Sequence, residues 1–153
     1  MVIREKTDTI VIHCAATKPS MDIGKDEIRK WHVDDNGWED IGYHFIIRRN
    51  GTVEEGRKID YQGAHAPAVN SRSIGICLIG GLSEDNKPEN NFTLEQFLSL
   101  SNVVDLMQSK YEIKSIVGHG DVQENKKNCP GFNVAQWLHK ENIYVGECYY
   151  GCF

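Results

Sequence analysis

Four reactive side chains fall within one short stretch, residues 118–131, which reads GHGDVQENKKNCPG. His119 offers an imidazole, Lys126 and Lys127 offer ammonium groups, and Cys129 offers a thiol. A thiol can serve as a nucleophile, as half of a disulfide, as a buried apolar group or as a metal ligand. Nothing inside the stretch decides between these roles for Cys129, so the rest of the chain has to.

His13 is a second unusual histidine, because it lies in the apolar run TIVIHCA at residues 9–15. Burying an unpaired imidazole costs free energy, and a backbone hydrogen bond is the commoner way to satisfy it. Two imidazoles and a thiolate also suit zinc, and three protein ligands leave one position open for water. His13, His119 and Cys129 are therefore candidate zinc ligands. Their spacing alone is not diagnostic, and no Cys-x-x-Cys or His-Glu-x-x-His motif accompanies them.

Nucleophilic catalysis by Cys129 is the second interpretation of the same residues. His119 could act as the general base for the thiol. However, Pro-Gly follows Cys129, rather than the helix start that commonly lowers the pKa of a thiol. The metal ligand is therefore favoured over the nucleophile.

The elements that must position these side chains are predicted to be buried strands. Apolar runs that predict such strands occupy residues 9–15, 73–81 and 113–119. His13 and His119 fall at the ends of the first and the last of them. Strand ends, and the loops that follow them, are where α/β folds place ligands.

The remaining predicted elements are one hairpin and three helices. Two β-prone runs flank Asn50-Gly51, a dipeptide that favours a hairpin turn. Thr93 and Gln96 resemble a capping box at the start of the strongest helix. In this helix the apolar residues at helical spacing are Leu94, Phe97, Leu98, Val104 and Met107. The helices are expected over residues 25–35, 93–111 and 133–141.

Strands interleaved with helices predict a single α/β domain with a central mixed β-sheet flanked by helices. A chain of 153 residues suits one such domain with one core. We expect the domain to span residues 1–142 and the tail, residues 143–153, to have a role that the sequence does not indicate.

Composition narrows the classes of partner. The formal net charge is −5, which argues against the basic face that a nucleic-acid-binding protein needs. No apolar run approaches the roughly 20 residues of a membrane span, so no stable membrane insertion is expected. The N-terminus lacks the pattern of a secretory signal, which predicts a cytoplasmic protein unless another protein releases it.

Five cysteines in a chain without an export signal make a poor disulfide framework. Cys14 and Cys77 lie in apolar runs and are expected to be core residues. Cys148 and Cys152 in the tail could pair, bind metal weakly or remain exposed thiols, and these alternatives stay open.

Four blocks of sequence resemble a known family when they are taken together. They occur in the order VIHCAATKPS, GWEDIGYHFIIRRNGTVEEGR, GAHAPAVNSRSIGICLIGG and GHGDVQENKKNCPG. This pattern resembles the phage-type N-acetylmuramoyl-L-alanine amidases, of the kind that short-tailed coliphages encode, which share a fold with the peptidoglycan recognition proteins. The resemblance covers residues 8–138, nearly the whole chain.

The resemblance implies a role for each matching position. His13, His119 and Cys129 match the three zinc ligands of the family. Tyr43 matches a tyrosine beside the metal, where it orients water or relays a proton. Lys127, two residues before Cys129, matches the catalytic lysine.

Two parts of the match are less direct. The segment between His119 and Cys129 is slightly longer than in the coliphage enzymes, so Lys126 competes with Lys127 for the role of the catalytic lysine. The resemblance also implies that the loop around His65 and Asn70 lies along the substrate groove.

The implied activity is zinc-dependent hydrolysis of the amide between N-acetylmuramic acid and L-alanine in peptidoglycan. Such an enzyme would act as an endolysin: it would wait in the host cytoplasm and reach the cell wall through a separate lysis protein. A peptidoglycan-binding module without catalysis is the alternative, and the presence of Cys129 favours the enzyme. Regulation of a phage RNA polymerase is a further, weaker alternative.

Overall fold

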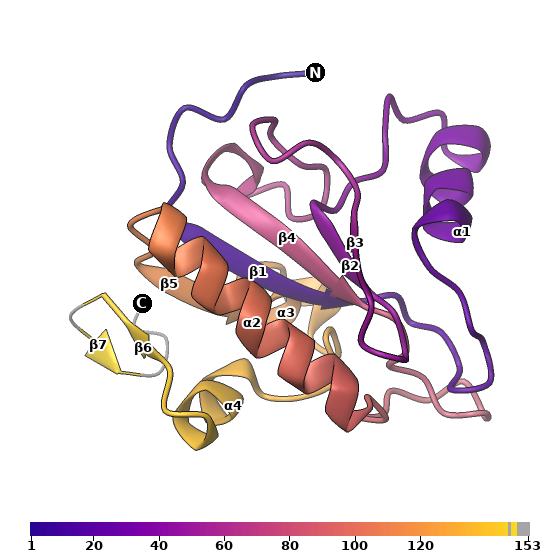
Figure 1. Cartoon of the computed structure of the whole chain (residues 1–153). Helices are drawn as coiled ribbons and strands as arrows, with labels where there is room; N and C mark the ends of the chain where they lie inside the picture. Colours follow the sequence, from indigo (N-terminus) through magenta and orange to yellow (C-terminus); the bar gives the residue numbers. More distant parts are fainter. Residues whose placement is uncertain (147, 150–153) are drawn as a thin grey trace.

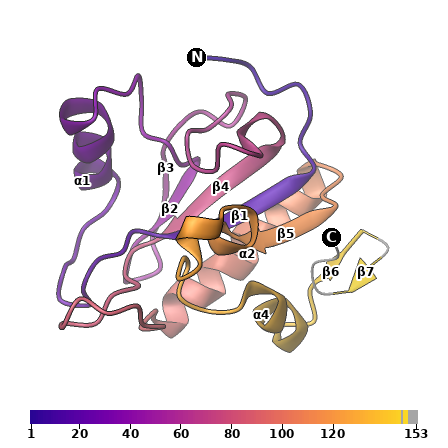
Figure 2. The same ribbon diagram turned by 180° about the vertical axis from the view of Figure 1, so that it is seen from behind.

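Helices cover both faces of a central five-stranded sheet (Figure 1 and Figure 2). The structure is a computed structural model that describes residues 1–146 and 148–149. The strands are β1 (Thr9–Cys14), β2 (Phe45–Ile47), β3 (Val53–Glu55), β4 (Ser73–Leu78), β5 (Ser115–Gly118), β6 (Tyr144–Val145) and β7 (Cys148–Tyr149). The α-helices are α1 (Lys25–Arg29), α2 (Leu94–Lys110), α3 (His119–Val122) and α4 (Val134–Lys140). Shorter helical turns cover Lys30–Asp35, Asn70–Arg72 and Glu124–Lys126.

The sheet has the strand order β3-β2-β4-β1-β5. The β2, β4, β1 and β5 strands run parallel, and β3 pairs antiparallel with β2 at one edge. The predicted α/β fold with a central mixed sheet is therefore confirmed. The hairpin predicted around Asn50-Gly51 is the β2–β3 pair, and Gly51 there has a φ of +88°, a conformation that glycine adopts without strain.

Every residue of β1 and β4 is buried, which explains why their sequences are almost continuously apolar. Ile10 and Ile12 face the cluster under α2 and α4, which is the larger of the buried clusters. Val11 faces the opposite side and packs with Val117. His13 shares that side of β1, so the site lies opposite α2.

The α2 helix begins at the predicted capping box. The Gln96 backbone N–H donates to Thr93 Oγ1 at 3.1 Å, and the Thr93 N–H donates to Gln96 Oε1 at 3.0 Å. Such a cap stabilises a helix by about 1 kcal/mol. The Gln96 amide also donates to the carbonyls of Ile47 and Ile79, so the same side chain ties α2 to the sheet.

The buried face of α2 differs in part from the expected one. Val104 and Met107 are buried as their spacing suggests, but Leu94 and Leu98 are 70% and 58% exposed. Phe97 is partly buried. The face that meets the sheet is centred on Leu100 and on the residues one turn after it, because the Gln96 contacts set the rotation of the helix.

The first predicted helix, residues 25–35, is present in two parts. The α1 helix is followed by a wider π-helical turn over Lys30–Asp35, in which the N–H of Asn36 donates to the Trp31 carbonyl. Ile28 packs α1 against Ile41 and Ile46. None of the helices in residues 1–146 and 148–149 is both long and apolar enough to cross a membrane.

The first residues of the tail pack onto the domain. Ile143 contacts the larger core cluster, and Val145 is fully buried in it. Residues 144–145 pair with residues 148–149 as an antiparallel ribbon. Cys148 belongs to this ribbon, whereas Cys152 lies outside the described residues, so their roles stay open.

His44, directly before β2, is a buried histidine with both ring nitrogens bonded. The Gly75 backbone N–H donates to Nδ1 at 3.0 Å, and Nε2 donates to the Tyr61 carbonyl at 2.7 Å. This pattern fixes a neutral ring. Burial lowers the pKa of His44 from 6.5 to about 4.

The His44 pKa predicts a loss of stability in acid. Between pH 6.5 and about 4 the unfolded chain binds a proton at this residue that the folded chain rejects, so the free energy of unfolding falls with decreasing pH. The full contribution is about 3 kcal/mol. Urea unfolding at a series of pH values should therefore show a shallower acid decline in His44→Asn than in the wild type. The same substitution at His139, an exposed residue of α4, serves as the control, and an unchanged decline in His44→Asn would contradict the prediction.

Candidate metal centre

Three side chains from distant parts of the sequence meet at the C-terminal ends of the parallel strands. His13 is in β1, His119 directly follows β5, and Cys129 lies in the loop before α4. Their ligand atoms all lie within 4.8 Å of one another, which makes them a group that could hold a metal ion. The Nδ1 atoms of the two histidines are 3.0 Å apart. Two nitrogen ligands of a tetrahedral zinc lie about 3.3 Å apart, so a small movement would admit the ion.

The other ring nitrogen of each histidine is already engaged. His119 Nε2 lies 2.6 Å from Gln123 Oε1, and His13 Nε2 lies 2.8 Å from His65 Nδ1. An amide oxygen can only accept, so the His119 ring carries its proton on Nε2 and leaves Nδ1 free. Both imidazoles thus present Nδ1 to the point where a metal would sit, as ligating histidines held by an outer hydrogen bond do.

Burial keeps the two imidazoles neutral. It lowers the pKa of His13 well below the usual value, and the neighbouring His65 and His119 act in the same direction. Burial also lowers the pKa of His119, with a smaller contribution from the positive charge of Lys126. A neutral imidazole has the free lone pair that a metal needs.

The thiol of Cys129 has a different electrostatic setting. The pKa of Cys129 is raised, and the larger cause is contact with the Cys14 thiol; burial is the second cause. At the same time the Cys14 backbone N–H lies 3.2 Å from Cys129 Sγ and donates to it. A metal ion that binds here has to displace the thiol proton, after which that N–H stabilises the thiolate.

Tyr43 lies beside the histidines. Its ring centroid is 5.0 Å from that of His13, with the planes tilted by 56°. Burial raises the pKa of Tyr43 well above 10, and the nearby Cys77 and Cys129 thiols add to the effect. The phenol therefore keeps its proton at neutral pH and can donate a hydrogen bond, but it does not serve as a base.

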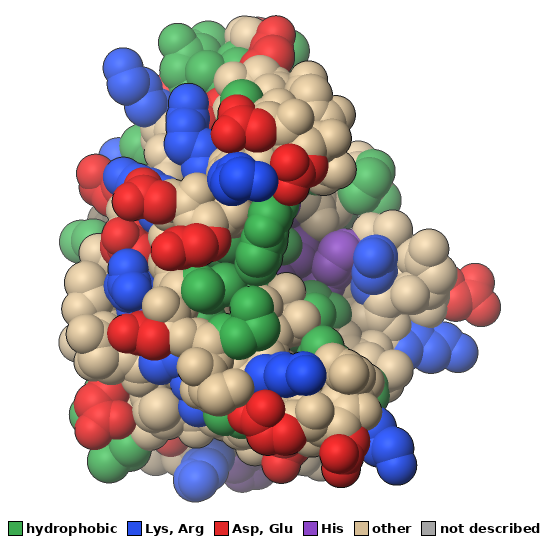
Figure 3. All heavy atoms as spheres, turned by 90° about the vertical axis from the view of Figure 1, so that its right-hand side faces the viewer, with side chains coloured by type: hydrophobic (Ala, Val, Ile, Leu, Met, Phe, Trp, Pro, Cys, Tyr) green, Lys and Arg blue, Asp and Glu red, His purple; other side chains and the backbone are tan. Residues whose placement is uncertain are grey.

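Lys126 and Lys127 are both exposed, at the end of the helical turn that begins at Glu124. The charge of Lys126 is near enough to lower the pKa of His119 and of Cys14. Figure 3 shows histidine side chains at the floor of a hollow, with a Lys or Arg side chain on its rim. The assignment of the catalytic role to Lys127 stays a prediction, and Lys126 stays its competitor.

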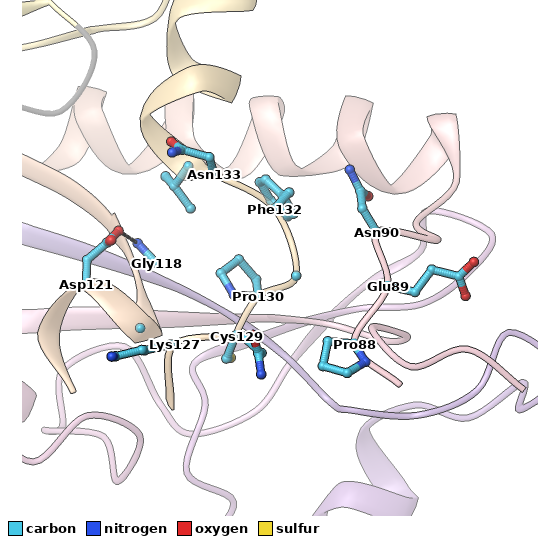
Figure 4. Close-up of a pocket in the computed structure, with 14 residues that line it drawn as sticks. Pro88, Glu89, Asn90, Gly118, Asp121, Lys127, Cys129, Pro130, Phe132 and Asn133 are labelled. Carbon is cyan, nitrogen blue, oxygen red and sulfur yellow. Dashed lines mark hydrogen bonds between the residues drawn. The ribbon is translucent and has the colours of Figure 1, made fainter. Parts of the chain in front are cut away.

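A pocket of about 470 Å³ lies next to Cys129 (Figure 4). It is lined by residues 88–90 on one side and by parts of residues 118–134 on the other. Within it the Asp121 carboxylate accepts a hydrogen bond from the Gly118 N–H at 2.8 Å, which fixes the start of α3 next to His119.

His65 and Asn70 do not project freely from their loop. His65 is 7% exposed, and Asn70 Oδ1 accepts hydrogen bonds from the backbone N–H groups of His65 and Ala66. Contact of these two residues with substrate stays a prediction. Gln123 is the part of the site that sequence reasoning missed; its only signal is that it lies four residues after His119, one turn further along a helix.

The fold and the site together define a class: an α/β domain with a hydrolase-type candidate metal centre at its strand ends. Residues 4–132 match the N-acetylmuramoyl-L-alanine amidase family, so the chain belongs to that family. It is 45% identical to the endolysin of Enterobacteria phage K11 and 44% identical to that of Escherichia phage T7, in each case over 94% of this chain and 93% of the relative. Among solved structures it is similar to the N-acetylmuramoyl-L-alanine amidase LysC from Clostridium intestinale URNW. That match has a TM-score of 0.75 and 32% identity, and it covers 90% of this chain and 87% of that one. The predicted family resemblance is confirmed.

Removal of the thiol should remove the metal. Cys129→Ala leaves only two ligands of the cluster, and we expect zinc content after dialysis to fall from about one ion per chain to near zero. Elemental analysis of the purified protein, with circular dichroism to verify folding, measures this. Cys77→Ala is the matched control, because Cys77 is also a free thiol but is not part of the cluster. A Cys129→Ala protein that keeps a full equivalent of zinc would exclude the assigned ligand set.

Proposed function

We propose that this N-acetylmuramoyl-L-alanine amidase is zinc-dependent, with His13, His119 and Cys129 as the ligands and peptidoglycan as the substrate. The observation that carries the proposal is the meeting of two imidazoles and one thiol whose ligand atoms lie within 4.8 Å of one another. A nitrogen and sulfur donor set of this kind suits zinc. The reaction adds water across the amide between the lactyl group of N-acetylmuramic acid and L-alanine. The C–N bond breaks, the lactyl group becomes a carboxylate, and the peptide gains a free amino group.

A zinc ion held by three protein ligands supplies a Lewis acid and leaves one position open to water or substrate. The protein supplies the orientation. His65 and Gln123 hold the two imidazoles with Nδ1 facing the cluster, and the Cys14 N–H supports the Cys129 thiolate.

Two further side chains are assigned to the chemistry of the amide. Tyr43, which keeps its proton, is assigned the donation of a hydrogen bond that orients water or moves a proton towards the leaving amine. Lys127 is assigned to the negative charge that develops on the carbonyl oxygen, where a positive group lowers the barrier.

The biological role that we propose is lysis of the bacterial host. The relatives from phages K11 and T7 carry the name endolysin, and their similarity extends over almost the whole chain. In this proposal the enzyme collects in the host cytoplasm and reaches the wall after a separate lysis protein opens the membrane.

Chelation tests zinc dependence directly. Protein stripped of metal should lose nearly all activity on purified peptidoglycan and regain it when zinc is added. Labelling of new amino termini should identify L-alanine as the residue released at the cleavage point. A stripped protein that hydrolyses walls at an unchanged rate would overturn the proposed mechanism, and wall binding without release of peptides would indicate a non-catalytic binding module.

Paired substitutions separate the two lysines. Removal of a group that stabilises an oxyanion typically lowers kcat by about 10²–10³-fold, and we expect this loss in Lys127→Ala. The matched control is Lys126→Ala, for which a decrease of less than about tenfold in kcat is expected, because its charge acts on His119 from the rim. Zinc content should stay unchanged in both variants. A larger loss in Lys126→Ala would transfer the catalytic role to Lys126.

A further inference from the structure

A chain of three buried side chains leads from the candidate metal centre into the sheet. His13 Nε2 lies 2.8 Å from His65 Nδ1, and His65 Nε2 lies 3.3 Å from Ser73 Oγ. His13, His65 and Ser73 are 1%, 7% and 0% exposed. Ser73 is the first residue of β4, so the chain starts at the metal cluster and ends on the backbone of a central strand.

The His65 ring is held in a slot that only glycine can form. A Cβ atom at Gly75 would lie 2.6 Å from His65 Cγ, and one at Gly63 would lie 2.5 Å from His65 Cδ2. The ring therefore lies against bare backbone at both positions. The two hydrogen bonds from the His65 and Ala66 N–H groups to Asn70 Oδ1 fix the loop that carries it.

Metal binding at His13 determines where the protons lie in this hydrogen-bonded series of side chains. When Nδ1 of His13 gives its lone pair to a metal, the proton of the neutral ring must be on Nε2. That N–H can donate only to a lone pair on His65 Nδ1, which places the proton of His65 on its Nε2. The His65 Nε2–H then donates to Ser73 Oγ. Burial lowers the pKa of His65 well below the usual value, in agreement with a neutral ring.

We propose that His65 is a positioning residue for zinc: it accepts the Nε2–H of His13 and so holds Nδ1 of His13 towards the metal. This inference rests on the proposed zinc dependence. It gives His65 a role that acts through His13 rather than on the substrate. Gln123 has the corresponding place at His119, but it is only partly buried at the end of α3, whereas His65 is buried.

Zinc affinity is the first test, measured by competition with a chromophoric chelator. Loss of a hydrogen-bond partner to a ligating histidine typically weakens metal binding by about 10- to 100-fold, and we expect this in His65→Leu. His65→Asn should recover most of the affinity, because its amide oxygen can occupy the place of Nδ1 and accept from His13. A merely structural histidine would show no such rescue.

The matched control is His44→Leu. His44 is also buried, at 1% exposed, and its two ring nitrogens bond to Gly75 and Tyr61 rather than to His13. This variant should lose thermal stability but keep its zinc affinity within about threefold of the wild type. If His65→Leu keeps its zinc affinity and instead raises KM for peptidoglycan, His65 contacts the substrate and the proposal is wrong.

A measurement on the unaltered protein covers the case in which the leucine variant does not fold. Long-range ¹H–¹⁵N correlation spectra of the zinc-loaded protein report the protonation of each imidazole nitrogen. We expect His13 to be metal-bound through Nδ1 and His65 to carry its proton on Nε2. A proton on His65 Nδ1, or metal on His13 Nε2, would overturn the proposal. A chain that binds no zinc at all would instead contradict the proposed function.

Discussion

The parallel pairing of β1 with β5 is the constraint on which the candidate metal centre depends. Ile12 lies opposite Gly118, so the next residues, His13 and His119, lie side by side at the C-terminal ends of β1 and β5. A shift of one residue in this register would turn His13 to the other face. The apolar residues that fill both faces of β1 set the register, and through it they set the distance between the two imidazoles.

Four buried histidines near one another are tolerated because each stays neutral and finds hydrogen-bond partners; they are His13, His44, His65 and His119. An unpaired buried imidazole would cost free energy, and a charged one more. The same property that suits His13 to a metal, a low pKa, makes the folded state sensitive to acid. Stability and metal binding therefore both require that the buried imidazoles stay neutral.

Much of this arrangement was predictable from local patterns. The apolar runs predicted the strand positions, and Thr93 and Gln96 predicted the start of α2. The positions of His13 and His119 at strand ends predicted that the two side chains meet where those strands end. The residue types named Cys129 as one candidate ligand, and the family pattern favoured that role over the nucleophile. What could not be predicted depends on side-chain contacts between distant segments: the rotation of α2, the bond from Gln123 to His119 and the slot around His65. A loop of small and turn-forming residues gives no periodicity from which a buried ring could be inferred.

The two halves of the site differ in how firmly the fold holds them. His13 and its partner His65 are set in the core, whereas Gln123 and Cys129 belong to a loop on the surface. That loop is closed by its own backbone bonds: the Gly120 N–H donates to the Cys129 carbonyl, and the Cys129 N–H donates to that of Lys126. A Cβ at Gly120 would lie 2.7 Å from the Lys126 carbonyl oxygen, so the tight closure requires glycine. A metal ion shared between His13 and Cys129 would therefore join the buried half of the site to the loop half, and it would hold in place the loop that carries Lys126 and Lys127.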